Sequence, residues 1–263
     1  MQCLVLNLKR NPERWQAMTE QAGLIGLPVQ RVEAVDGCAL TPDEVEGIYS
    51  PSLNQNQFHR PLVPGEIGCY ASHRALWHRL LASNDTMFAV FEDDVILSAR
   101  LPQALAAISE LPPDWDMIKL VRRKREATRS VQSLSDGSSL VCYPRVPSLT
   151  AAYVITRSGA QKLLQYRTPF GRPVDVDLRH WWECGLRIYG LRPCPVRSAP
   201  AARASSIAER RSVDPSLQGR LRKLRFQLRY TARNWLASHG WAPAVPAPRT
   251  GEASEQHRVL NSR

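Results

Sequence analysis

The chain has 263 residues, of which 43% are hydrophobic and 22% are charged. This composition is typical of a globular protein with one large domain or two small ones, and it excludes a disordered or fibrous chain. The 35 lysines and arginines exceed the 24 aspartates and glutamates, which gives a net charge of +11. A surplus of this size favours a nucleic acid, an anionic membrane surface or an acidic substrate as the partner.

The sequence has no recognisable membrane span or secretion signal. No run approaches the ~18 consecutive apolar residues of a spanning helix. The apolar residues 3–6 precede the first basic residues, whereas a signal peptide has the opposite order. We therefore expect a cytosolic protein. The six cysteines show neither CxxC nor another zinc-ligand spacing, so we expect free and mostly buried thiols.

Helices and strands are expected to alternate to about residue 200. A strand at 4–8, a helix at 13–22 and a strand at 28–35 form a βαβ unit, which favours a parallel sheet. A polar loop is expected at 41–64. The further elements expected are a helix at 65–82, strands at 87–91, 116–121 and 151–155, and helices at 101–111 and 159–166, the last capped by Ser158. The pattern predicts an α/β fold with a mostly parallel central sheet.

Most of the surplus charge lies in residues 197–236, which hold ten basic and two acidic residues. Apolar residues recur there at helical spacing, with basic residues on the flanks: Leu217, Leu221, Leu224, Leu228 and Trp235. A basic amphipathic helix of this kind binds anionic membrane surfaces. A helix packed on the rest of the protein, or a nucleic-acid-binding arm, are the alternatives.

These changes of composition divide the chain into three parts. Residues 1–208 form the predicted α/β domain, and residues 209–240 form a basic helical tail. Residues 241–263 are polar and contain several prolines, so we expect them to be disordered.

Three acids, Glu92, Asp93 and Asp94, directly follow the apolar strand at 87–91. Because side chains alternate along an extended chain, Glu92 and Asp94 are expected on one side and Asp93 on the other. Ligands of open α/β folds bind at the carboxyl ends of the strands. Paired carboxylates there suit Mg²⁺ or Mn²⁺, whose remaining ligands usually come from a substrate phosphate and water. The alternative is a solvated, inert acidic turn.

Several longer motifs occur in order along the chain. They are NLKRNPERW at 7–15, RVEAVDG at 31–37, PGEIGCYASHRALW at 64–77, FEDDV at 91–95, AAYVITRSGAQKLL at 151–164 and RPVDVDL at 172–178, with Ser-Ser-Ile at 205–207. Together they resemble glycosyltransferase family 25, which contains lipooligosaccharide galactosyltransferases of Gram-negative bacteria and animal collagen galactosyltransferases. The resemblance implies a GT-A-like single domain, a UDP-sugar donor (most often UDP-galactose), a divalent metal and inversion at the anomeric carbon.

The resemblance also assigns residues to the reaction. It makes Asp94 the direct ligand of Mn²⁺ (or Mg²⁺) and Glu92 its partner toward the donor diphosphate. Asp175 matches the family's PVD motif and is the expected general base, which takes a proton from the acceptor hydroxyl. Asp177 and Glu183 are the alternatives nearby. Asp175 could instead bind the acceptor or cap the following helix.

Other residues of these motifs are expected around the donor. His73 and Trp77 share a helix face, and for His73 an orienting hydrogen bond is weighed against proton transfer in catalysis. Gly65 and Gly68 would allow the backbone to approach the nucleotide or a neighbouring strand. The donor-binding residues expected from topology and resemblance are Asn7, Arg14, Asp36, Gly37, Gly68, Ser72, Glu92 and Asp93.

The resemblance therefore implies an enzyme that transfers galactose from UDP-galactose to a lipooligosaccharide- or LPS-type acceptor, at the cytoplasmic face of the inner membrane. UDP-glucose or a UDP-N-acetylhexosamine is the alternative donor. A non-catalytic, membrane-tethered protein that binds glycans or nucleotides is the alternative class. The basic residues 122–125 would contact phosphates of a lipid-linked acceptor or form a solvated loop. No nucleic-acid partner is expected.

Overall fold

An eight-stranded sheet forms the centre of the protein. The computed structural model describes residues 1–122, 126–199 and 216–240, and within them the strand order is β2-β1-β3-β8-β5-β9-β7-β6. These strands are β1 (Gln2–Asn7), β2 (Gln30–Glu33), β3 (Met87–Glu92), β5 (Met117–Lys119), β6 (Arg129–Ser133), β7 (Ser139–Cys142), β8 (Ala152–Thr156) and β9 (Ile188–Arg192). β4 (Val95–Leu97) and β10 (Val196–Ser198) pair separately as an antiparallel ribbon.

Strand direction decides which loops meet. Six of the eight strands run in one direction, as the sequence predicts, while β8 and β7 run in the other. β8 lies between β3 and β5 and is antiparallel to both. The register pairs Phe91 with Ala152, so the segment that enters β8 lies where β3 ends. The carboxyl ends of β1, β2 and β3 and the start of β8 therefore share one edge of the sheet.

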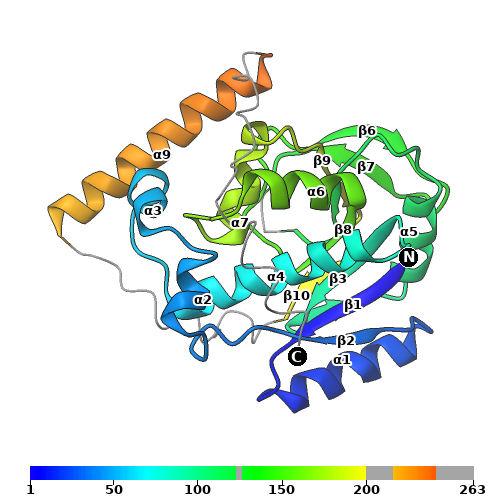
Figure 1. Cartoon of the computed structure of the whole chain (residues 1–263). Coiled ribbons are helices and arrows are strands. Elements are labelled where there is room, and N and C mark those ends of the chain that lie inside the picture. The colour runs from blue at the N-terminus through cyan, green and yellow to red at the C-terminus, as the bar shows by residue number, and fades with distance from the viewer. Residues whose placement is uncertain (123–125, 200–215, 241–263) are drawn as a thin grey trace.

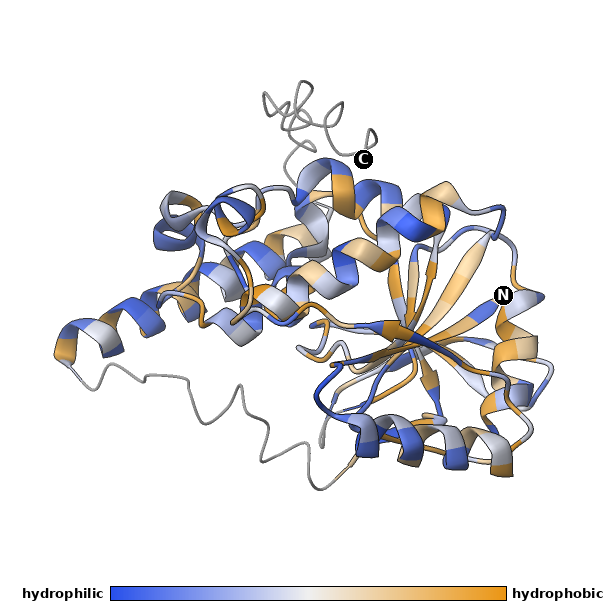
Figure 2. Cartoon of the chain, turned by 60° about the horizontal axis from the view of Figure 1, so that its bottom comes forward, coloured by the Kyte–Doolittle hydropathy of each residue, from blue (hydrophilic) through white to orange (hydrophobic). Residues whose placement is uncertain are grey.

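Helices cover both faces of the sheet (Figure 1). The helices around it are α1 (Pro12–Leu24), α4 (Pro64–Ala82), α5 (Leu101–Ser109), α6 (Arg157–Tyr166), the short α7 (Val174–Asp177) and the 3-10 helix η1 (Leu178–Glu183). Along β1, Cys3 and Val5 pack with α1 and α5, while Leu4 and Leu6 pack with α4. This alternation requires apolar residues on both faces of the central strands, and Figure 2 shows hydrophobic colouring along much of the sheet.

The predicted polar loop at 41–64 is wrong, because it contains two helices, α2 (Pro42–Glu46) and α3 (Pro51–Gln57). Thr41 and Glu44 form a reciprocal capping box at the start of α2. The hydroxyl of Ser50 accepts a hydrogen bond from the Leu53 N–H and caps α3. Each helix also has proline in its first turn, so local capping signals outweigh the polar composition.

The other predicted helices and strands of the domain are present. The predicted capping residue of α6 is wrong. The hydroxyl of Thr156, and not that of Ser158, accepts the hydrogen bond from the Gly159 N–H. Ser158 instead donates to Asp116 Oδ1 at 2.9 Å. Both residues have a small side chain with a hydroxyl group near the start of the helix, so the sequence alone did not show which of them caps it.

A buried ion cluster fixes the segment around α7. Arg167 and Arg172 are both less than 4% exposed. Asp177 lies 2.8 Å from Arg172 and 3.2 Å from Arg167, and it accepts a hydrogen bond from the Tyr70 hydroxyl at 2.6 Å. Glu183 contacts both arginines at 2.5 Å. Two buried guanidinium groups thus have two carboxylates around them, which a low-dielectric interior requires.

The last described helix, α9 (Leu217–Ser238), lies beside α3 on the side of the molecule away from β1 and β2 (Figure 1). Tyr230 and Ala237 are buried in a cluster with Trp182, and Asn234 donates to the Pro144 carbonyl at 2.8 Å. The five apolar residues that the sequence places on one stripe are all exposed, by 52% to 78%. The helix therefore packs on the domain with one face and presents its leucines to solvent with another.

Several expectations fall outside the described residues. They are most of the basic segment 122–125, the Ser-Ser-Ile at 205–207 and the predicted disorder of 241–263. Across the part of the chain that is described, no helix combines the length and apolar character needed to cross a membrane.

A contact between two glycines joins α4 to the loop that follows β2. A Cβ built on Gly68 would lie 2.4 Å from the Gly37 nitrogen and 2.6 Å from the Val35 oxygen. A Cβ on Gly37 would lie 1.7 Å from the Pro64 oxygen. Backbone meets backbone here, so no side chain could move aside to make room.

We predict that Gly68→Ala lowers the free energy of unfolding by about 1–3 kcal/mol, because the added methyl forces helix and loop apart. Urea denaturation measures the change. The control is Gly23→Ala in α1, where a Cβ would meet nothing within 4 Å and where alanine favours the helix by about 0.5–1 kcal/mol. Equal stability of the Gly68 variant and the native protein would contradict the close contact.

Candidate active site

A pocket of about 140 Å³ opens at the sheet edge where β1, β2 and β3 end. Its walls come from these three strand ends, from the start of α1 and from α4. The predicted site residues that line it are Arg14, Asp36, Gly37, Ser72, His73, Glu92, Asp93 and Asp94. Topology thus brings together side chains from four separate segments, as the rule for ligand sites in open α/β sheets predicts.

All three acids of the predicted metal motif line this pocket. The expectation that Asp93 faces away from Glu92 and Asp94 is wrong. β3 ends at Glu92, and Asp93 and Asp94 form a turn before β4. Strict alternation of side chains applies only to extended backbone, so the turn lets all three carboxylates approach one space.

Two side-chain donors and a buried cation surround Glu92. Its Oε1 accepts a hydrogen bond from the Thr150 hydroxyl at 2.9 Å and lies 3.3 Å from His73 Nε2. Burial raises the pKa of Glu92, but the hydrogen bonds from His73 and Thr150 and the charge of Lys119 outweigh it, so the pKa lies below its usual value. Glu92 is therefore ionised at neutral pH.

The surroundings of Asp94 shift its pKa in the opposite direction to that of Glu92. Burial, followed by the charges of Glu92 and Asp93, raises its pKa to about 7. Its Oδ1 is buried and has no hydrogen-bond partner in the described part of the chain. A buried, unpaired carboxylate oxygen beside two other carboxylates is a suitable ligand for a hard divalent cation, which would supply the missing positive charge.

Asp93 is tied to β1 and α1. The Asn7 side-chain amide donates to Asp93 Oδ2 at 2.6 Å, and Arg14 Nη1 lies 3.2 Å from Asp93 Oδ1. Asn7 itself is only 1% exposed and accepts a hydrogen bond from Arg31. Asn7 thus orients Asp93 without lining the pocket itself, whereas Arg14 belongs to the pocket wall.

The loop after β2 is fastened to α4 by Ser72. The Ser72 hydroxyl accepts from the Val35 N–H at 2.8 Å and donates to the Gly68 carbonyl at 2.7 Å. Asp36 forms an ion pair with Arg10 at the pocket wall. Gly68 makes the backbone contact with Gly37 described above, so the structure gives it a packing role beneath the pocket.

His73 is fully buried, and both of its ring nitrogens are engaged. Trp77 Nε1 donates to the Tyr153 hydroxyl at 3.2 Å, and that hydroxyl lies 2.8 Å from His73 Nδ1. If the Tyr153 hydroxyl donates to His73 Nδ1, then Nε2 carries the ring proton and donates it to Glu92. Each polar group in this series of hydrogen bonds then has a partner. These contacts favour the orienting hydrogen bond over proton transfer for His73.

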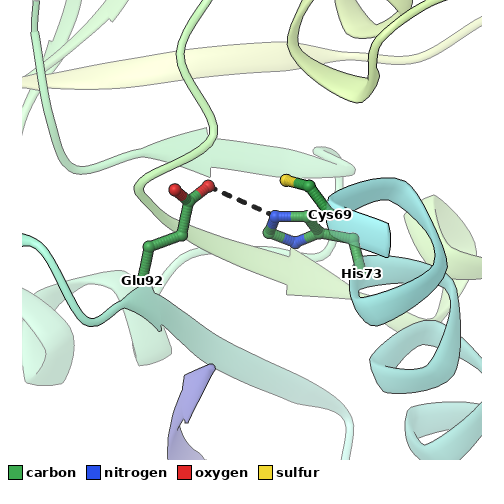
Figure 3. Close-up of side chains that lie close together, drawn as sticks. All are labelled: Cys69, His73 and Glu92. Carbon is green, nitrogen blue, oxygen red and sulfur yellow. Dashed lines mark hydrogen bonds and ion pairs between the residues drawn. The ribbon is translucent and has the colours of Figure 1, made fainter. Parts of the chain in front are cut away.

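Cys69 joins His73 and Glu92 in a second possible metal-binding set (Figure 3). The ligand atoms of these three residues lie within 4.8 Å of one another. Sulfur and imidazole suit softer ions such as Zn²⁺ better than Mn²⁺ or Mg²⁺. Burial, followed by the charges of Glu92, Asp175 and Asp94, raises the pKa of the Cys69 thiol well above its usual value, so without a metal it is a neutral thiol.

The candidate bases lie in different surroundings. Asp175 is half-buried, and its charge reaches Cys69 in the pocket wall. Asp177 is 3% exposed and belongs to the buried cluster with Arg172 and Tyr70. Glu183 is held by Arg172 and Arg167, whose charges outweigh its burial and keep its pKa far below the usual range. Asp175 is not itself a lining residue of the pocket, but of the three acids it is the one whose charge raises the pKa of a thiol in the pocket wall.

Sequence reasoning missed four residues of the site. Thr150, Tyr153 and Lys119 support Glu92 and His73 from the centre of the sheet, and Cys69 lies one helical turn before His73. The i, i+4 spacing of Cys69 and His73 was a visible signal for the last of these. Thr150 and Tyr153 lie beside Glu92 and His73 because β8 runs antiparallel to β3, and Lys119 lies on β5, the next strand of the sheet.

The profile of glycosyltransferase family 25 (LPS biosynthesis protein) matches residues 1–178. A glycosyltransferase 25 family member of Anopheles gambiae is 32% identical over 179 residues, which are 66% of this chain and 30% of that protein. Procollagen galactosyltransferase 2 of Homo sapiens is 30% identical over 180 residues, which are 66% of this chain and 28% of that protein.

The chain thus spans less than a third of the length of these relatives. The matched segment contains β1, β2, β3 and α4, which build the pocket, and it extends through Asp175 and Asp177. The resemblance drawn from the sequence motifs is confirmed, because the profile covers more than half of the chain. The chain belongs to glycosyltransferase family 25.

Proposed function

We propose that the protein is an inverting, metal-dependent glycosyltransferase with a GT-A-like domain, and that it transfers galactose from UDP-galactose to a lipooligosaccharide- or LPS-type glycan. The observation that carries the proposal is the unpaired, buried Oδ1 of Asp94, in a pocket where Glu92 and Asp93 add two more carboxylates. Membership of the family and the names of its galactosyltransferase members support transfer of galactose.

The donor set fits Mn²⁺ or Mg²⁺, because three carboxylates supply hard oxygen ligands and one of them lacks a partner. Asp94 would hold the ion directly, with Glu92 as its neighbour. When bound, the ion neutralises charge that develops on the UDP leaving group. Arg10 and Arg14 on the same wall add positive charge toward a diphosphate, and Asp36 and Gly37 lie at the end of β2, where the nucleoside would bind.

Asp175 would act as the general base. The acceptor hydroxyl oxygen forms a bond to the anomeric carbon from the side opposite the diphosphate, the bond between that carbon and the diphosphate oxygen breaks, and Asp175 takes the hydroxyl proton. Attack from the opposite side inverts the anomeric configuration. Asp177 would keep the loop in place, because Arg172 and Tyr70 already hold its carboxylate.

We further propose that the protein works on a lipid-linked acceptor at the cytoplasmic face of the inner membrane. The exposed stripe of α9 supports this proposal: Leu217, Leu221, Leu224, Leu228 and Trp235. Basic residues flank the stripe, and a helix of this kind lies at the headgroup boundary of an anionic membrane.

The function is tested by measuring transfer from UDP-galactose, UDP-glucose and a UDP-N-acetylhexosamine, each with Mn²⁺ and with EDTA. We expect activity with UDP-galactose that requires the metal. Asp94→Asn should lower it at least about 100-fold, since even supporting residues of metal sites contribute 10–100-fold. Glu20→Gln on the surface of α1 is the control. Full activity of Asp94→Asn would contradict the metal assignment.

The raised pKa of Asp94 makes the stability of the metal-free protein depend on pH. The pKa is about 7 in the folded protein, against an ordinary value of 3.8 for an aspartate. The folded state therefore binds the extra proton between about pH 4 and pH 7, and stability falls as the pH rises through this window. In urea denaturation with EDTA, the native protein should lose stability relative to Asp94→Asn over that range. If the free energies of unfolding of the two proteins changed in parallel with pH, the pKa of Asp94 would not be raised in the folded protein.

Substitution of Asp175 and of Asp177, one at a time, distinguishes the catalytic role from the structural one. Asp175→Asn should lower kcat about 10²–10⁴-fold, as expected for loss of a general base, with unchanged stability and unchanged UDP affinity. Asp177→Asn should lower the free energy of unfolding by about 3–5 kcal/mol, because it leaves buried Arg172 short of its partner. Kinetics, titration calorimetry and urea denaturation of both variants test this. The roles would be reversed if Asp177→Asn folded normally and lost kcat.

A further inference from the structure

A second and larger pocket, of about 450 Å³, lies between α9 and the segment that contains η1. Its charged lining comprises Arg172, Glu183, Arg222, Arg225, Arg229 and Arg233. Five guanidinium groups thus face one carboxylate, and that carboxylate is already bound to Arg172 at 2.5 Å. His180 in the same wall adds no charge at neutral pH, because burial and the neighbouring Arg172 lower its pKa well below the usual value.

The arginines of α9 occupy a face of their own. Arg222, Arg225, Arg229 and Arg233 follow one another at spacings of three or four residues, which places them on one side of the helix. This side lies next to the face that Tyr230 buries against the domain. The leucine stripe lies on the far side of the helix and is exposed. The arginine pocket is therefore a separate surface from the apolar stripe.

The arginines have few partners of their own. Arg229 donates to the Asn56 carbonyl at 3.3 Å, and Arg233 lies 3.9 Å from Glu183. Within residues 1–122, 126–199 and 216–240, Arg222 and Arg225 make no side-chain hydrogen bond or ion pair. Like charges three and four residues apart on a helix repel one another. An anion with several oxygens would remove this repulsion.

We propose that this pocket binds a phosphate group of the acceptor glycan, as a phosphomonoester or a diphosphate. The inference rests on the proposed function and names the class of its acceptor. Guanidinium groups bind phosphate through paired hydrogen bonds, and four of them on one helix face present the donors in a row. The volume lies within the 300–1,000 Å³ of ordinary ligand pockets, so a phosphorylated sugar fits.

The position of the pocket links it to the proposed chemistry. Arg172 in its wall is three residues from Asp175, so the two Cα atoms are at most about 11 Å apart. A phosphate held in the pocket would thus place a nearby sugar hydroxyl beside the candidate base. The match to the family profile ends at residue 178, whereas α9 begins at Leu217. The four arginines that α9 contributes to the pocket therefore lie outside the matched segment and would give this chain a preference for its own acceptor.

Titration calorimetry with inorganic pyrophosphate in EDTA tests the site directly, since the acidic pocket at β3 repels pyrophosphate without a metal. Arg222→Gln/Arg225→Gln should weaken binding about tenfold or more, as expected for loss of hydrogen bonds to a charged group. The matched control is Arg220→Gln/Lys223→Gln, which removes the same charge from the same helix but does not alter the pocket lining. Equal weakening in both, or no pyrophosphate binding to the native chain, would overturn the proposal.

A second measurement identifies the source of the phosphate. With a phosphorylated glycan acceptor, Arg222→Gln/Arg225→Gln should raise the KM for the acceptor and leave kcat unchanged, and the increase should vanish when the same glycan is first treated with phosphatase. An equal KM for the two glycans, together with displacement of pyrophosphate by phosphatidylglycerol vesicles, would overturn the assignment to the acceptor.

The two proposals can fail separately. Pyrophosphate titration requires no donor and no metal, whereas hydrolysis of UDP-galactose with Mn²⁺ by the native protein requires no acceptor. Absence of hydrolysis with intact pyrophosphate binding would refute the transferase proposal and retain the anion site. Hydrolysis without pyrophosphate binding would refute the anion site alone.

Discussion

The crowding of three carboxylates at the end of β3 is the constraint on which the site depends. Asp93 is compensated by Arg14 and the amide of Asn7, and Glu92 by donors from α4 and the start of β8. Among the described residues Asp94 Oδ1 has no such partner, and burial, followed by the charges of Glu92 and Asp93, raises the pKa of Asp94 to about 7. A cation bound there would lower the electrostatic free energy of all three groups, which is the physical basis of the proposed metal site.

Two features of the backbone position the residues that surround these acids. The reversal of β8 places Thr150 and Tyr153 beside Glu92 and His73. The contact between Gly37 and Gly68 holds the loop after β2 against α4. Neither feature contributes a functional group, yet each fixes where functional groups lie. α9 adds a separate, arginine-rich pocket wall that comes from a later part of the chain.

The sequence predicts the elements whose signals are local. The apolar runs of β1 and β3, the helix of α4 and the acids at the carboxyl end of β3 follow from period and position. It does not predict the side on which Asp93 lies, because β3 ends at Glu92, two residues before the last acid to which alternation was applied. Nor does it reveal that Asp177 is buried against Arg172, since both residues read as polar and only tertiary packing pairs them.

Anomalous diffraction from crystals grown with UDP and MnCl₂ tests the central claim most directly, because manganese then marks its own position. We expect an anomalous peak bonded to the carboxylate of Asp94, with Glu92 beside it and the UDP phosphates completing the shell. A peak bonded to Cys69 and His73, or a UDP molecule bound with no manganese at Asp94, would contradict the assignment of the metal and of the chemistry built on it.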